Sequence, residues 1–154
     1  MPVFTSKKSR VDVSTPGYAE VMRGPKGDPG PKGDPGPSTG EELLTAIEPI
    51  TQYQVCRYAS ASTAGVASTQ YASHGNLVAG ICTTLSPTVG NVITVVNRGK
   101  ITNSSWSWIP GNQVFAGPNG SLTQTYDSNW AFVCVVGVAV DSTTLNVYLR
   151  PSVL

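Results

Sequence analysis

Short apolar runs rich in valine, isoleucine and threonine alternate with clusters of glycine, asparagine and serine from residue 51 to the C-terminus. Runs of this kind, bounded by turn-forming residues, predict β-strands. We expect seven strands, at residues 53–58, 76–83, 91–102, 113–116, 121–126, 130–140 and 144–150. That number of strands within about 100 residues predicts a small barrel or sandwich.

Two local patterns add detail to this expectation. Apolar residues at positions 145, 147 and 149 alternate with more polar ones, which predicts that the last strand has one buried face and one face that is more exposed to solvent. The Pro-Asn-Gly sequence at residues 118–120 predicts a tight turn, because asparagine and glycine adopt positive φ angles readily. We therefore expect a hairpin between residues 113–116 and 121–126.

Glycine recurs at every third position between residues 24 and 38, where the sequence reads GPKGDPGPKGDPGPS. Only glycine fits at the axis where three polyproline-II chains wind together, so this repeat predicts a collagen triple helix and a homotrimer. A stiff Pro/Gly linker in a monomer is the alternative. The glycines assigned to trimerisation are Gly24, Gly27, Gly30, Gly33 and Gly36.

Residues 39–50 follow a helix-like pattern. A capping-box threonine opens the segment, and Leu43, Ile47 and Ile50 are spaced by four and then three positions. We expect a short helical neck in which these three side chains trimerise and set the register of the collagen rod.

Residues 1–23 mix proline, serine, threonine and charged residues, and their apolar members are too sparse to close a core. We expect an extended arm laid on the surface of another protein, and a floppy tail is the alternative that composition leaves open. The residues assigned to this attachment are Phe4, Lys7, Lys8, Arg10 and Tyr18.

Charge and hydropathy exclude several classes of partner. The 154-residue chain has a formal net charge of +1, and 12% of its residues are charged, about half the usual share. It lacks the basic patch that binding to nucleic acid requires. The longest apolar run, residues 130–140, is far shorter than the ~20 residues of a membrane-spanning helix, and the N-terminus lacks the apolar stretch of a signal peptide. We expect neither nucleic acid nor membrane as a partner.

Candidate chemistry is sparse. The cysteines Cys56, Cys82 and Cys134 are odd in number and lie in apolar or strand-like runs, as buried free thiols do. Catalysis needs a convergent set of titratable groups, and the chain offers one histidine and few carboxylates outside the repeat. We expect no enzyme activity, no cofactor and no metal. His74 is interpreted as a solvated loop residue, and a metal site made by three copies is the alternative.

Aromatic residues form the other candidate site. Trp106 and Trp108 alternate and would share one face of a strand, and Trp130 follows the expected hairpin together with Tyr126. Exposed together, they would make a patch that stacks on sugars or docks a protein. Burial of these residues in the barrel core or a subunit interface is the alternative and fits the low aromatic content better.

The succession of arm, brief GPKGDPG repeat and C-terminal β-domain resembles collagen-containing structural proteins of tailed bacteriophages. The likeness covers residues 24–154, and WSWIPGNQVFAGPNGSLTQTY followed by VVGVAVDSTTLNVYL is similar to a recurrent module of phage virions. It implies a trimeric fibre, tail spike or capsid decoration on the virion surface, assembled in the bacterial cytoplasm and without catalytic residues. The arm is far shorter than the usual tail-attachment domain, which favours the capsid.

These patterns predict a mainly β homotrimer in four parts. They are an extended arm (1–23), a collagen-like triple helix (24–38), a short helical neck (39–50) and a C-terminal β-barrel or sandwich knob (51–154). The expected function is that of a capsid decoration or head fibre, with the arm on the major capsid protein and the knob outward. The alternative is a receptor-binding tail fibre or tail spike, attached to a tail protein, whose knob adheres to host surface glycan. A cellular collagen-like adhesin is a weaker third interpretation.

Overall fold

The structure is a computed structural model that describes residues 27–31, 40–85 and 87–150. The chain divides into two compact units, Met1–Pro35 and Gly36–Leu154. In the first unit, residues 27–31 are exposed and contain neither helix nor strand. The predicted arm and most of the predicted triple helix lie outside the described residues.

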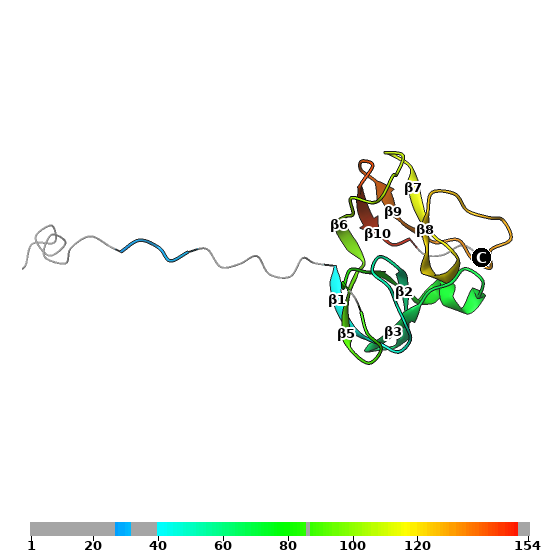
Figure 1. The fold of residues 1–154 in the computed structure, drawn as a ribbon, viewed down its shortest axis with the longest axis horizontal. Coiled ribbons are helices and arrows are strands. Elements are labelled where there is room, and N and C mark those ends of the chain that lie inside the picture. Colours follow the sequence, from blue (N-terminus) through cyan, green and yellow to red (C-terminus); the bar gives the residue numbers. More distant parts are fainter. Residues whose placement is uncertain (1–26, 32–39, 86, 151–154) are drawn as a thin grey trace, which may run out of the picture. The chain divides into compact units, whose positions relative to one another are not determined.

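Five strands of the second unit close into a small barrel (Figure 1). In the order in which they pair around the barrel, they are β1 (Glu41–Ala46), β3 (Thr63–Val66), β2 (Val55–Ser60), β4 (Val78–Cys82) and β5 (Val92–Val96). The first strand closes the barrel, because β1 pairs in parallel with β3 and antiparallel with β5.

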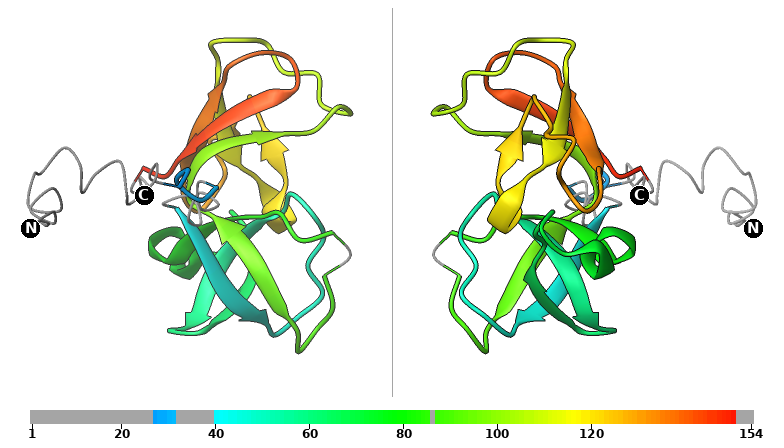
Figure 2. Two further views of the ribbon diagram at one scale, coloured as in Figure 1. Left: turned by 90° about the vertical axis from the view of Figure 1, so that its left-hand side faces the viewer. Right: turned by 90° about the vertical axis from the view of Figure 1, so that its right-hand side faces the viewer.

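The remaining five strands form an antiparallel sheet beside the barrel. In spatial order they are β6 (Arg98–Thr102), β10 (Thr144–Tyr148), β9 (Val135–Ala139), β7 (Gln113–Ala116) and β8 (Leu122–Thr123). The chain passes from the barrel to this sheet through Asn97 alone, between β5 and β6. Figure 2 shows the barrel strands, coloured cyan to green, on one side and the second sheet, extending to red, on the other.

Two short 3-10 helices complete the described structure. They are η2 (Ala72–Leu77), which precedes β4, and η3 (Pro118–Gly120), which joins β7 to β8. No helix in the described ranges has the length and apolar character needed to cross a membrane.

Two apolar clusters hold the second unit together. One fills the barrel and includes Leu44, Cys56 and Ile93, and the other lies between barrel and sheet and includes Val55 and Phe132. Adjacent residues of one barrel strand therefore serve different cores. This double burial explains why the barrel strands have near-continuous apolar sequences rather than strict alternation.

The structure confirms a mainly β fold that contains a barrel, although the barrel has five strands and a second sheet lies beside it, and it corrects the predicted neck. Residues 41–46 form strand β1 instead of a helix. Leu44 and Ala46 point into the barrel, with 1% of each exposed, whereas Leu43 is 68% exposed. A two-turn helix is marginal on its own, so pairing with strands on both sides decides the conformation. The β-domain accordingly begins at β1 rather than at residue 51.

The burial of Ile50 limits which side chains of this segment can meet another copy. Ile50 is 4% exposed and belongs to the cluster inside its own barrel, while Ile47 is 49% exposed. Of the three neck residues assigned to trimerisation, only Leu43 and Ile47 present their side chains to the outside.

Several strand predictions are confirmed and others are shifted. The turn at residues 118–120 does connect the antiparallel pair β7 and β8, and Leu145 and Val147 are buried as the alternation predicted. The expected strand at 91–102 is two strands, β5 and β6, and the one at 121–126 is reduced to the two residues of β8. β3 is an additional strand.

Candidate functional site

Trp106 and Trp108 are structural aromatics rather than part of one patch with Trp130. They lie in the loop between β6 and β7 and pack, half-buried, against the core between barrel and sheet. The Trp106 ring centroid is 5.0 Å from that of Tyr53 and 5.4 Å from that of Trp108. With their rings tilted against these neighbours, the two tryptophans pack on the core, as the alternative interpretation of these residues predicted.

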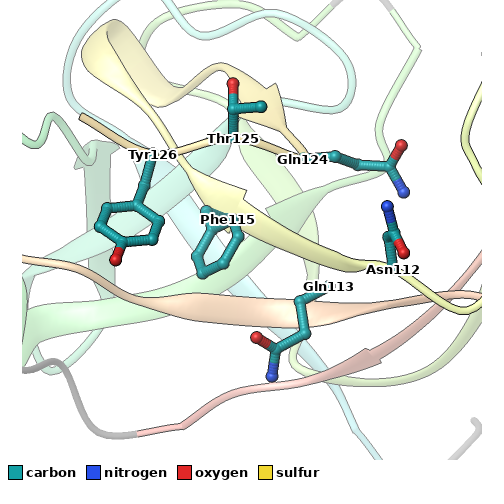
Figure 3. A pocket seen from close by; sticks show the side chains of 6 residues that line it. All are labelled: Asn112, Gln113, Phe115, Gln124, Thr125 and Tyr126. Carbon is teal, nitrogen blue, oxygen red and sulfur yellow. The ribbon is translucent and has the colours of Figure 1, made fainter.

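Trp130 lies instead beside Tyr126, next to two adjoining hollows on the surface. The first, shown in Figure 3, has a volume of about 420 Å³ and is lined by Asn112, Gln113, Phe115, Gln124, Thr125 and Tyr126. The second, of about 660 Å³, lies on the other side of Thr125 and Tyr126 and includes Asp127, Ser128 and Trp130. We call the two hollows together the Tyr126 groove.

The ring of Tyr126 stands between the two hollows and is 58% exposed. Its centroid lies 5.4 Å from that of Phe115, and the rings are tilted by 54°. Phe115 belongs to β7 and is only 9% exposed. Phe115 therefore packs against the Tyr126 ring, while more than half of the surface of Tyr126 stays available to a ligand.

Side-chain hydrogen bonds fix the loop that carries Tyr126. The Gln124 side chain accepts a hydrogen bond from the Ile109 N–H at 2.8 Å and donates one to the Ile109 carbonyl at 2.9 Å. Asp127 Oδ1 accepts hydrogen bonds from the backbone N–H of Asn129 at 2.8 Å and from its side-chain amide at 2.9 Å. The loop thus keeps a defined shape although β8 is only two residues long.

Two amide side chains of the Tyr126 groove have no protein partner. Among the described residues, the side chains of Asn112 and Gln113 make no hydrogen bond to the protein, and both residues are exposed. Each amide carries donors and an acceptor. Figure 3 shows Asn112 beside Gln124, at the end of the hollow away from Tyr126, so the groove offers uncommitted amides and an exposed aromatic ring at different places along it.

An ionic cluster lines a third hollow, of about 380 Å³, near η2. Arg57 Nη2 lies 3.4 Å from Glu48 Oε1, which also accepts a hydrogen bond from the Val66 N–H at 2.8 Å. His74 is half-buried, and its Nδ1 accepts a hydrogen bond from the Ser68 N–H at 3.1 Å. This contact places the proton of the neutral imidazole on Nε2.

The structure differs from the predicted solvated loop histidine. His74 belongs to η2 and stacks against Tyr71, with 5.1 Å between the ring centroids. Burial, followed by the positive charge of Arg57, lowers the pKa of His74 below its ordinary value. No group of three or more His, Cys, Asp or Glu side chains that could hold a metal ion is found in the described part of the chain.

All three cysteines are free and buried, as predicted. The Cys56 thiol donates a hydrogen bond to the Gln54 carbonyl at 3.7 Å, and Cys56 and Cys82 lie on the paired strands β2 and β4. Interaction with the neighbouring Cys82 thiol, and then burial, raise the pKa of Cys56, and interaction with the Cys56 thiol lowers the pKa of Cys82 to about 7. Burial raises the pKa of Cys134 to about 11. Because at most 1% of each cysteine is exposed, all three thiols belong to the cores, and the lowered pKa of Cys82 does not make it accessible to a reagent.

The barrel also exposes apolar side chains on its outer face. Thr45 of β1 pairs with Val92 of β5, so Leu43, Ile47 and Val92 point outward on the same side. Leu43 is 68%, Val92 59% and Ile47 49% exposed. We call these three residues the outer strip. Sequence analysis identified two of its members, although for a helix.

The other residues assigned to sites lie partly outside the described ranges. This applies to all five arm residues and to Gly24, Gly33 and Gly36. Gly27 and Gly30 are described and exposed, and a Cβ atom added to either would meet no atom of its own chain within 4 Å.

Comparison with known proteins gave no relative: no protein-family model and no curated protein sequence matches this chain.

Proposed function

We propose that this protein is a homotrimeric structural protein of a tailed bacteriophage virion, a capsid decoration or head fibre. Its N-terminal arm anchors it to the major capsid protein, residues 24–38 form a collagen-like triple helix, and the β-domain projects outward. It carries no enzyme activity. It assembles in the bacterial cytoplasm and acts on the virion surface.

The glycines of the repeat carry this proposal. Neither Gly27 nor Gly30 adopts a positive φ, and around each there is open space within its own chain. A single chain therefore has no steric need for glycine at these positions. Three chains wound together do need it, at every third position, and the sequence supplies it five times in succession.

The outer strip supports association of the β-domains at the end of the rod. Four residues lie between Gly36 and Glu41 at the start of β1, so the two are at most about 17 Å apart along the chain. Three chains joined in one rod would therefore hold their first barrel strands near a common axis. Burial of Leu43, Ile47 and Val92 from each copy would remove exposed apolar surface from water.

The low charge of the chain is compatible with an assembled state. Only 12% of the residues are charged, whereas isolated soluble domains usually depend on a charged surface. A threefold rod presents three identical arms at its base, which suits a threefold or pseudo-threefold site on an icosahedral shell. Three weakly binding arms on one rod act through effective concentration.

Sedimentation of the full chain tests the trimer. We expect a trimer at micromolar concentration for the wild type and a weaker one for Leu43→Asp, because three carboxylates would be forced together at the outer strip. Ile109→Asp is the matched control, since Ile109 is 61% exposed but lies in the loop between β6 and β7. A monomeric wild type would refute the architecture.

Deletion of residues 2–20 tests whether the protein is attached to the capsid and whether its N-terminal arm is the end that attaches. We expect the shortened trimer to stay soluble and to lose binding to particles that lack the protein, as seen by electron microscopy. If this variant still bound the particles, with its β-domain in contact with the shell, the β-domain would be the anchor and the proposed orientation would be wrong. Hundreds of copies per virion are expected for a head protein, and a few copies found only at the tail would support a receptor-binding fibre instead.

A further inference from the structure

The Tyr126 groove has a composition that the proposed structural role does not explain. Its two hollows have volumes of about 420 and 660 Å³ and share Thr125 and Tyr126 as a common wall. The first hollow is also lined by the amides of Asn112 and Gln113, and the second by Ser128 and Trp130. An elongated ligand would therefore meet an aromatic ring in the middle and hydrogen-bonding groups at both ends.

We propose that the Tyr126 groove binds a neutral oligosaccharide chain. A pyranose ring presents C–H groups on its faces and hydroxyl groups around its rim. The Tyr126 ring can stack on the C–H groups, because Tyr126 is 58% exposed and its ring is held in place by contact with Phe115. The Asn112 and Gln113 amides can donate to and accept from the hydroxyls, since no described residue uses them.

The charges of the groove favour a neutral sugar over an acidic one. Among the described residues, no lysine or arginine lines either hollow, and the only carboxyl group that does so belongs to Asp127. Because Asn129 engages only Oδ1, the second carboxylate oxygen of Asp127 is left to accept hydrogen bonds from hydroxyl groups. A phosphate or uronate in the groove would meet this negative charge without a compensating cation.

A peptide is a poorer match for the same surface. Peptide-binding grooves anchor apolar side chains in apolar pockets, or they extend a sheet through a row of backbone hydrogen bonds. Here the hollows are lined mostly by amide and hydroxyl groups, and the neighbouring strand β8 has only two residues. These features agree better with the many hydroxyl groups of a saccharide.

Binding at the groove is compatible with a trimer that uses the outer strip. Within the second unit, β1 and β5 lie on the left in Figure 1, and the loop after β8, coloured orange, lies on the right. The Tyr126 groove is therefore remote from Leu43, Ile47 and Val92. Three copies joined through the outer strip would present three grooves to one polysaccharide chain or surface, which strengthens weak individual binding.

The test is binding of purified full-length protein to immobilised dextran, galactan and mannan, with alginate and polygalacturonate as acidic probes. We expect binding to at least one neutral polysaccharide and weaker binding to the acidic ones. Tyr126→Ala should lower the affinity by about fivefold to tenfold, whereas Tyr126→Phe, which keeps the stacking ring, should stay within about twofold of the wild type.

Matched variants separate loss of the ligand site from loss of the fold. Leu85→Ala truncates a side chain that is 77% exposed and lies outside the groove, so it should bind like the wild type. Should Tyr126→Ala fail to fold, Gln113→Ala tests the same groove, because its side chain has no described partner and its loss should weaken binding severalfold.

Three results would overturn the proposal: no binding to any neutral probe, unchanged binding by both Tyr126→Ala and Gln113→Ala, or preference for the acidic probes. The measurement uses isolated protein and no virions. Its outcome is therefore separate from that of the particle-binding experiment, and either inference can fail without the other.

Discussion

The neighbouring leucines of β1 provide a direct test of the fold at the start of the β-domain. Leu44 is 1% exposed, pairs with Ile93 across the ladder and fills the barrel, whereas Leu43 is 68% exposed. Truncating a fully buried leucine to alanine costs about 2.7–5.0 kcal/mol. Because β1 is held between two neighbours, the barrel has little freedom to close around the gap, and we expect about 3–4 kcal/mol for Leu44→Ala.

The exposed leucine should behave differently. Leu43→Ala should change the folding free energy by less than about 0.5 kcal/mol, as surface substitutions usually do. Its effect should fall on association and should therefore depend on protein concentration. The sequence-based helix makes the opposite prediction, because in that arrangement Leu43 is the buried residue.

Urea unfolding of the full chain distinguishes the two arrangements, with the fluorescence of the core-packed Trp106 and Trp108 as the signal. Leu44→Ala should lower the midpoint by roughly 1–3 M at every protein concentration, given typical dependences of stability on urea. Leu43→Ala should leave the midpoint of the dissociated protein unchanged. If the two variants were equally destabilised, or if Leu44→Ala cost less than about 1 kcal/mol, the register of β1 would be wrong.

Three further predictions address the thiols, the ionisation of one tyrosine and the repeat. The three buried cysteines should resist iodoacetamide in the native protein and react fully in guanidinium, so rapid native labelling would contradict their burial. A 2.6 Å hydrogen bond to Glu42, and then burial, raise the pKa of Tyr58 to about 12. The stability from this hydrogen bond is present in full below pH ~10 and lost as the pH rises through the folded value. After allowance for the partial exposure of the pair, Tyr58→Phe should lower the free energy of unfolding by about 1 kcal/mol at pH 8 and by much less above pH 12. An equal loss of stability at both pH values would refute this. Gly30→Ala should lower the melting temperature of the repeat seen by circular dichroism and leave the melting of the β-domain unchanged, since it would place three methyl groups at the axis.

The strands that sequence predicted best are those whose pattern is local. β10 has an alternating pattern along its whole length, and the Pro-Asn-Gly turn identifies the pairing of β7 with β8 without knowledge of the rest of the fold. Burial of the cysteines also follows from the apolar residues around each one. In these cases the residues that determine the structure are neighbours in the chain.

The errors arise where distant pairing decides the outcome. Leu43 begins a helical spacing that continues at residues 47 and 50, whereas Leu44 and Ala46 form a strand alternation, and only the ladders to β3 and β5 choose between the two. β3 reads TAGV, a sequence too short and too poor in large apolar residues to be recognised alone. Its Gly65 and Ala64 are buried because the chain passes close to β2 and β1 there.

The candidate site was partly visible in the sequence. Trp130 and Tyr126 are close in the chain, and sequence analysis placed them together in a ligand patch. Their separation from Trp106 and Trp108 depends on how the loops fold back on the core, which no periodicity encodes. Asn112 and Gln113 come from the other side of the β7–β8 hairpin and gave no recognisable signal. Uncommitted amides become notable only once their surroundings are known.

The arrangement of the strands has a consequence for how the protein resists aggregation. A closed barrel has no strand with unpaired backbone groups, so five of the ten strands offer nothing for another chain to extend. The second sheet ends on one side in β8, which is only two residues long, and on the other in β6, where Arg98 and Lys100 are exposed. Very short edge strands and edge cations both discourage the intermolecular pairing that leads to amyloid. Because the chain has few charges, charge repulsion between copies is weak. Its protected strand edges allow many copies to be packed closely while each β-domain stays separately folded.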